Sequence, residues 1–178
     1  DKGLYARDAH RRAVEWLADY TAIPYPYGKI DAIGLADFEA GAMENPGAIT
    51  YRLTAIAADP HEASTDTLKD IFYTAAHELT HMWWGDLVTM AWWNGLWLNE
   101  AFASWMGNKS AAVVWPENEF SRETARDTLD AMDTDSLSTA RAIRQPIKST
   151  DDIFNAFDGL TYDKGAGVLA MFESYLGE

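Results

Sequence analysis

The sequence contains no cysteine among its 178 residues. Disulfide bonds and thiolate metal ligands are therefore excluded, and any transition metal must be held by histidine, aspartate or glutamate. Because disulfides persist mainly in oxidising compartments, a chain without cysteine is more typical of a reducing compartment such as the cytoplasm.

Basic residues are also scarce. The 14 lysines and arginines face 28 aspartates and glutamates, which gives a formal net charge of −14. Nucleic acids attract basic surfaces, so this balance argues against a nucleic acid partner. The acidic excess is typical of a solvated surface; alternatively, it produces a field that attracts metal ions or ammonium groups.

Long apolar runs are missing as well. A membrane-spanning helix needs about 20 consecutive apolar residues, and no stretch approaches that length, so we expect no membrane span in this segment. The sequence opens with Asp1-Lys2-Gly3 instead of a methionine and a hydrophobic stretch, so we expect no signal peptide here and interpret the chain as part of a longer protein. Its length predicts a single domain, residues 1–178, with its own core.

Strand-like segments give way to helical periodicity along the chain. Lys29–Leu35 and Ala48–Ala57 are rich in β-formers and predict strands, whereas Gly41–Gly47 between them is too rich in turn formers for a regular element. Residues 133–150 are expected to be irregular. Apolar spacing predicts helices at Tyr5–Tyr20, Leu68–Trp83 with a cap at Ser64 or Thr65, about Gly95–Val114, Glu117–Met132, and from near Tyr162 to Leu176. This order indicates an α+β domain.

The sharpest motif is His77-Glu78-Leu79-Thr80-His81, in the second predicted helix. Residues four apart lie one turn apart on the same helical face, so His77 and His81 can grip one metal ion. Glu78 lies beside them, where it can reach a metal-bound water instead of the metal.

A third ligand is needed, because catalytic zinc usually takes three protein ligands and keeps one position for water. His10 and His61 are weak candidates, since isolated histidines most often lie at the surface. Glu100 is better, because it lies in an apolar, tryptophan-rich helix where a carboxylate needs a counter-charge. The alternative is a buried helix pair whose histidines merely form hydrogen bonds.

Three motifs together resemble the zinc signature and neighbouring sequences of the aminopeptidase N family. The order and spacings agree from about Tyr25 to Leu176. The motifs are His77-Glu78-x-x-His81 followed by Glu100 within Trp97-Leu98-Asn99-Glu100, the exopeptidase motif Gly41-Ala42-Met43-Glu44-Asn45, and Leu160-Thr161-Tyr162-Asp163-Lys164-Gly165.

The resemblance implies a gluzincin, a thermolysin-like zincin catalytic domain with a small mixed sheet followed by a mostly helical part that contains the zinc helices. It also implies an N-terminal β domain and a C-terminal helical domain that pack on this one. The implied activity is hydrolysis of the N-terminal peptide bond of peptides with a free N-terminus.

The resemblance also assigns roles to individual residues. His77, His81 and Glu100 would ligate one zinc ion, Glu78 would be the general base, and Tyr162 would stabilise the tetrahedral intermediate. The peptide's α-amine and strand would be bound by Glu44 together with Gly41, Ala42, Met43 and Asn45.

Four positions depart from the family pattern. Pro46 stands where many relatives have an aromatic residue, and Gly95 where they often carry aspartate. Ala101 replaces a common glycine, and Thr80 a common alanine. These changes affect the expected side-chain preference more than the chemistry.

Three other functions stay open. A thermolysin-like endopeptidase shares the His-Glu-Leu-Thr-His pattern, although the spacing to Glu100 and the loop with Glu44 speak against it. A non-catalytic peptide- or metal-binding module has no chemical need for Glu78 or Tyr162. An epoxide-hydrolase variant of the family is compatible with Asn45-Pro46, but the residues around Glu100 look more like those of ordinary aminopeptidases.

Overall fold

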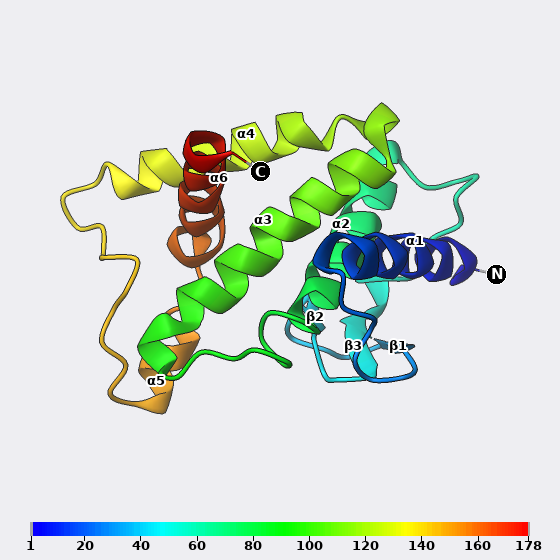
Figure 1. Cartoon of the computed structure of the whole chain (residues 1–178), viewed down its shortest axis with the longest axis horizontal. Coiled ribbons are helices and arrows are strands. Elements are labelled where there is room, and N and C mark those ends of the chain that lie inside the picture. Colours follow the sequence, from blue (N-terminus) through cyan, green and yellow to red (C-terminus); the bar gives the residue numbers. More distant parts are fainter. Residues whose placement is uncertain (1, 178) are drawn as a thin grey trace.

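One helix and a three-stranded sheet form the first part of the molecule, and helices form most of the rest (Figure 1). The computed structural model describes residues 2–177, so Asp1 and Glu178, the ends of the predicted domain, lie outside the described residues. The predicted small mixed sheet followed by a mostly helical part is confirmed. Within residues 2–177, none of the helices combines the length and the apolar character that a bilayer span requires.

The first helix, α1 (Leu4–Thr21), packs against the two long helices α2 (Thr65–His81) and α3 (Leu96–Val114) through one buried stripe. Its buried residues recur every three or four positions: Ala6, Ala9, His10, Ala13 and Leu17. The helix ends at Ala22, which adopts the left-handed conformation with φ 55°. This agrees with the helix predicted over Tyr5–Tyr20.

The sheet has the order β1-β3-β2 and is mixed. β1 (Asp31–Leu35) runs parallel to β3 (Ala48–Arg52), and β2 (Ala42–Met43) pairs antiparallel with the other edge of β3. Alternate residues of β3, Ile49 and Tyr51, are fully buried. β2 is thus an edge strand directly before the turn that contains Glu44.

Two strand predictions are wrong. The segment Gly41–Gly47 was expected to lack regular structure, but β2 lies within it, because β3 offers its backbone groups as partners there. The second strand does not continue to Ala57. It ends at Arg52, and the 3₁₀ turn η1 (Leu53–Ala55) follows, closed by the Ile56 N–H, which donates to the Leu53 carbonyl at 3.4 Å.

Two long helices carry His77, His81 and Glu100. α2 (Thr65–His81) begins at Ser64, whose hydroxyl accepts from the Thr67 N–H at 3.1 Å, as the predicted cap requires. After the 3₁₀ turn η2 (Trp93–Gly95), α3 (Leu96–Val114) crosses α2 with extensive contacts (Figure 1).

The last third of the chain wraps the other side of α3. The remaining elements are η3 (Pro116–Asn118), α4 (Phe120–Asp135), α5 (Thr150–Phe154), η4 (Leu160–Lys164) and α6 (Gly165–Leu176). The helix predicted over Glu117–Met132 starts three residues later, because Glu119 adopts φ 53° and interrupts it. The expected irregular stretch, residues 133–150, lies mostly between α4 and α5.

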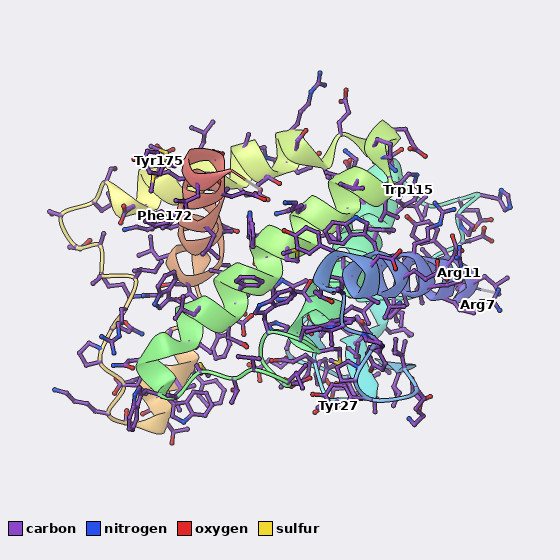
Figure 2. All side chains as sticks on the ribbon, in the orientation of Figure 1. Arg7, Arg11, Tyr27, Trp115, Phe172 and Tyr175 are labelled. Carbon is purple, nitrogen blue, oxygen red and sulfur yellow. The ribbon has the colours of Figure 1, made fainter. Side chains whose placement is uncertain are left out.

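The outer face of α6 is apolar and exposed. Figure 2 labels two of its side chains, Phe172 and Tyr175, which are exposed together with Met171 and Leu176. The inner face begins at Gly165 and Ala166, which are buried.

Candidate active site

Three buried side chains from α2 and α3 converge on one point. The Nε2 atoms of His77 and His81 lie 3.1 Å apart. The Oε2 atom of Glu100 lies 3.4 Å from His77 Nε2 and 3.5 Å from His81 Nε2. The structure thus brings together the three side chains expected to act as metal ligands, and each is at most 7% exposed.

The triangle formed by these three atoms fits a tetrahedral zinc ion. Zinc bonds to imidazole nitrogen and carboxylate oxygen are about 2.0–2.2 Å long, so ligand atoms of a tetrahedral site lie about 3.3–3.6 Å apart. The observed separations of 3.1 to 3.5 Å match that spacing. Two imidazoles and one carboxylate are also a donor set that zinc accepts in catalytic sites.

The charges of the three groups are coupled. Burial would raise the pKa of Glu100, but the two histidines outweigh it and hold that pKa well below its usual range. Burial lowers the pKa of His77. Burial alone would lower the pKa of His81 too, but the hydrogen bond and charge of Glu100 raise it to about 9. Glu100 is therefore an anion at neutral pH, ready to hold a cation.

Two further acidic residues, Glu44 and Glu78, lie beside this triangle of side-chain atoms. Carboxylate oxygens of Glu44 and Glu78 lie within 4.8 Å of each other and of a His81 ring nitrogen. Burial raises the pKa of Glu78 to about 8. Its Oε2 atom is buried and has no hydrogen-bond partner among the described residues. A buried carboxylate oxygen without a partner is costly, and it is positioned to accept a proton or a hydrogen bond from a bound molecule.

The loop with the exopeptidase motif connects the sheet to this site. Its backbone is fixed at both ends: Gly41 O accepts from the Arg52 N–H at 2.8 Å, and the Asn45 N–H donates to Met43 O at 3.0 Å. Between them the edge strand β2 leads into Glu44, which has a carboxylate oxygen within 4.8 Å of Glu78 and His81 side-chain atoms. All five residues, Gly41, Ala42, Met43, Glu44 and Asn45, are thus carried by one edge strand and its turn.

Tyr162 lies on an unusual backbone segment. Residues Leu160–Lys164 form a π-helical turn that continues into α6. Such turns are rare and occur frequently at functional sites. The Tyr162 ring stacks on His77, with the ring centroids 6.0 Å apart and the planes tilted by 27°. A helix start near Tyr162 was expected; the π-helical geometry was not.

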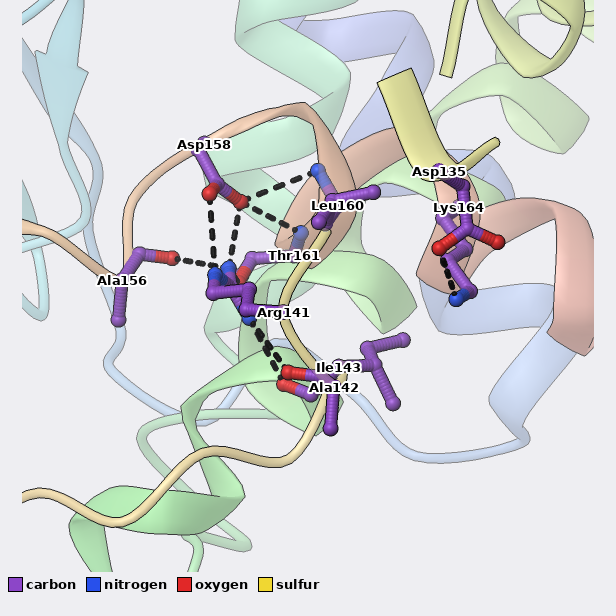
Figure 3. Close-up of polar contacts among 9 residues, drawn as sticks. All are labelled: Asp135, Arg141, Ala142, Ile143, Ala156, Asp158, Leu160, Thr161 and Lys164. Carbon is purple, nitrogen blue, oxygen red and sulfur yellow. Dashed lines mark hydrogen bonds and ion pairs between the residues drawn. The ribbon is translucent and has the colours of Figure 1, made fainter. Parts of the chain in front are cut away.

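A polar network holds this turn in place (Figure 3). The Asp158 carboxylate accepts from the Leu160 and Thr161 N–H groups at 3.0 and 3.1 Å. Arg141 donates to Asp158 at 3.0 Å and to the Thr161 hydroxyl at 2.7 Å. Lys164 forms an ion pair with Asp135 at the end of α4. The segment that carries Tyr162 is therefore fixed from both sides.

The Tyr162 phenol faces the acidic groups of the site. Burial, followed by the charge and hydrogen bond of Glu100, raises the pKa of Tyr162 far above its usual value. The phenol therefore keeps its proton at neutral pH and can donate a hydrogen bond.

The other two histidines do not join the site. His10 is buried between α1 and the sheet, where its ring bonds to Ala6 O and the Tyr51 hydroxyl, both at 2.7 Å. His61 is exposed in the loop before α2. His10 therefore links core elements, rather than lying at the surface as expected.

The sequence alone did not predict some neighbours of these acidic and imidazole groups. Asn99 donates to Glu100 Oε1 at 3.0 Å, which orients the oxygen that does not face the histidines. Burial and the charge of Glu44 raise the pKa of Asp86 to about 6. Asn99 was detectable as the neighbour of Glu100 in the sequence, whereas nothing in the sequence pattern pointed to Asp86.

Comparison with known proteins gives a consistent result. Residues 5–178 match the model of the peptidase family M1 domain. Aminopeptidase M1-B of Oryza sativa subsp. japonica is 40% identical over 177 residues, which cover 99% of this chain and 20% of the rice protein.

Two further relatives come from distant organisms. Endoplasmic reticulum aminopeptidase 1 of Homo sapiens is 42% identical over 172 residues, 97% of this chain and 18% of the human protein. Probable aminopeptidase 1 of Saccharolobus solfataricus is 40% identical over 178 residues, 99% of this chain and 23% of that protein. The chain thus spans about a fifth of the length of the curated relatives it matches.

Proposed function

Because this chain belongs to peptidase family M1, we propose that it is the catalytic part of a zinc-dependent aminopeptidase that hydrolyses the N-terminal bond of peptides. The observation that carries the proposal is the triangle of His77, His81 and Glu100, with sides of 3.1 to 3.5 Å. The proposal includes a thermolysin-like arrangement of residues 1–178 as a single domain.

His77, His81 and Glu100 would hold one zinc ion. When bound there, zinc would polarise the scissile carbonyl and lower the pKa of a water molecule toward about 7. The chain's own contribution is to fix three donor atoms in advance on two packed helices, so that little reorganisation is needed on binding.

Glu78 is the proposed general base. It would take a proton from the attacking water and deliver it to the leaving amine. Its buried Oε2 atom lacks a protein partner among residues 2–177, and its pKa is raised to about 8 without metal. A carboxyl group with a pKa near the working pH can both accept and release a proton.

Tyr162 is the proposed hydrogen-bond donor to the carbonyl oxygen as that oxygen gains negative charge. Its raised pKa keeps the phenol protonated. The Asp158 and Arg141 network holds its backbone in place, so the donor is oriented before substrate binds.

Glu44 is the proposed binding group for the peptide's free amine. An ammonium group leaving water requires a fixed anion, and Glu44 lies within 4.8 Å of the ligand atoms of Glu78 and His81. The edge strand with Ala42 and Met43 offers backbone groups to an extended peptide, and Gly41 and Asn45 flank it.

The rest of a full-length enzyme would pack on this domain, since the relatives are about five times longer. We expect the isolated chain to bind zinc but to cleave slowly, because parts of the substrate site would come from the other domains and loose positioning is costly.

The test compares free and blocked peptides in the full-length protein. We expect release of the first residue from peptides with a free N-terminus and no cleavage of the same peptides after N-acetylation. Rapid internal cleavage of the acetylated peptides would instead support the thermolysin-like endopeptidase.

A further inference from the structure

The remote ring nitrogen of His77 has a side-chain neighbour on the opposite helix. The Nδ1 atom of His77 lies 3.4 Å from the Ser104 hydroxyl oxygen. Ser104 is in α3, one turn after Glu100, and is 1% exposed. Residues four apart lie on the same helical face, so the helix that supplies a ligand also presents this hydroxyl to another ligand.

We propose that Ser104 is a positioning residue for the metal site: its hydroxyl accepts a hydrogen bond from Nδ1 of His77 and thereby leaves Nε2 of that ring free for the metal. The inference rests on the proposed zinc aminopeptidase function. It adds to that function a residue that acts through His77 and does not touch the substrate.

Only one tautomer of His77 leaves its Nε2 atom free for a metal ion. A neutral imidazole carries one proton, so one nitrogen donates and the other accepts. Nε2 of His77 faces His81 and Glu100, and it can bind a metal only if the proton is on Nδ1. An acceptor at Nδ1 favours that tautomer and fixes the orientation of the ring, as the outer partners of metal-bound histidines generally do.

A second side chain, Tyr73, packs against the same imidazole. Tyr73 lies one turn before His77 in α2, with its ring centroid 6.0 Å from that of His77. The Ser104 hydroxyl has two lone pairs besides its own proton, so it can accept from His77 Nδ1 and keep its proton for another acceptor.

Gly107 explains why α3 comes this close to α2. A Cβ atom on Gly107 would lie 3.2 Å from both the Cα and the N of His77. The glycine therefore lets the two backbones approach each other beside Ser104. The two helices lie this close together at His77 because the residue that faces His77 is a glycine.

His81 has a different kind of partner. Its Nδ1 atom lies 3.3 Å from the Trp84 carbonyl oxygen. This acceptor is a backbone carbonyl, so a side-chain substitution does not remove it. Ser104 is consequently the position where a side-chain change tests the role of an outer hydrogen bond to a ligand.

The experiment measures the zinc dissociation constant of the full-length protein by competition with a chelator. Loss of an outer partner of a metal-bound histidine typically weakens binding about 10- to 100-fold, so we expect at least a tenfold loss for Ser104→Ala. The matched control is Ser110→Ala, because Ser110 is equally buried in α3 but donates to the Gly107 carbonyl. Its zinc affinity should stay within about twofold of the unmodified protein, as for a change that touches no ligand.

The absorption spectrum of the cobalt(II)-substituted protein adds a readout that reports ligand geometry. Ser104→Ala should shift the visible bands, and Ser110→Ala should not. Unchanged zinc affinity in Ser104→Ala, or an equal loss in both variants, would overturn the inference. If the unmodified protein binds no zinc, the proposed function itself fails, and the two failures are thereby distinguished.

Two further variants test the role of the hydroxyl if the Ser104→Ala protein does not fold. Ser104→Cys is close in volume and offers a weaker acceptor, so we expect a loss of zinc affinity of at least about threefold. Ser104→Thr keeps the hydroxyl and should stay within about threefold of the unmodified protein. Wild-type affinity in the cysteine variant, or a loss in the threonine variant as large as in the cysteine variant, would contradict the role of the hydroxyl.

Discussion

Gly165, the first residue of α6, packs directly against Ala101, the residue after the proposed ligand Glu100. A Cβ atom on Gly165 would lie 2.5 Å from the Ala101 Cβ atom. Non-bonded carbon atoms do not approach so closely, so α6 and α3 can meet here only because one partner has no side chain. This contact joins the segment that carries Tyr162 to the helix that carries Glu100.

The contact predicts the effect of adding one methyl group. Gly165→Ala should lower the free energy of unfolding by about 1–3 kcal/mol, the usual cost of overpacking a tight contact. Urea unfolding of the full-length protein measures the change. The double variant Gly165→Ala/Ala101→Gly moves the methyl group to the other helix and should recover part of the loss. Gly41→Ala is the control, because a Cβ there would meet no atom within 4 Å.

Glu78→Gln tests the proton transfer. The glutamine keeps the size of the side chain but cannot accept a proton, so kcat should fall by about 10²–10⁴-fold. Bound zinc should stay at one ion per chain, because Glu78 is not one of the proposed ligands. Metal analysis and steady-state kinetics of the same sample check both expectations. Substantial remaining turnover would show that another group acts as the base.

Tyr162→Phe removes only the phenol oxygen. Loss of one donor to the developing negative charge typically costs about 10²–10³-fold in kcat, and we expect KM to change little. The zinc content should not change. A variant with normal kcat and a raised KM would mean that Tyr162 binds the substrate and does not stabilise the transition state.

The hydrogen bonds of Arg141 should indirectly affect the step in which Tyr162 is proposed to stabilise the transition state. Arg141→Gln removes the charge that holds Asp158 and Thr161, so the π-helical turn loses its support and kcat should fall, by less than in Tyr162→Phe. Arg122→Gln is the control, because Arg122 forms an exposed ion pair with Glu119. Equal kinetics of Arg141→Gln and the unmodified protein would show that the turn is held without Arg141.

Zinc binding should depend on pH. In the metal-free protein the pKa of His81 is about 9, raised from 6.5. A proton on His81 stabilises the folded metal-free protein fully below about pH 6.5, and this stabilisation disappears as the pH rises through about 9. Because the same proton competes with zinc, zinc affinity should rise about tenfold per pH unit up to that point. Calorimetry in two buffers of different ionisation enthalpy should detect proton release at pH 7. Affinity independent of pH between 6.5 and 8.5 would refute the coupling.

Local patterns made part of this site predictable. The spacing of His77 and His81 fixes both on one face of a helix wherever that helix lies. Apolar periodicity likewise located α1, α2 and α3 to within three residues of their bounds. Glu100 was predicted as the third ligand because a carboxylate in an apolar, tryptophan-rich helix needs a counter-charge. The role of Gly107, which permits the close approach of α3 and α2, could not be predicted from the residues around it, because that role depends on the distant residue His77.

Other features depend on distant parts of the chain. β2 forms because β3 offers a partner, although its own residues lie among turn formers. The π-helical geometry at Tyr162 accompanies contacts with Arg141, which lies in the stretch between α4 and α5 that has no periodicity. Such contacts are set by tertiary packing, which overrides local preference.

A crystal structure of the zinc-loaded, full-length protein, with anomalous data collected at the zinc edge, tests the central claim most directly. The account predicts one anomalous peak per chain, about 2.0–2.2 Å from His77 Nε2, His81 Nε2 and a Glu100 oxygen. A peak elsewhere, or a Glu100 side chain turned away from both imidazoles, would contradict it.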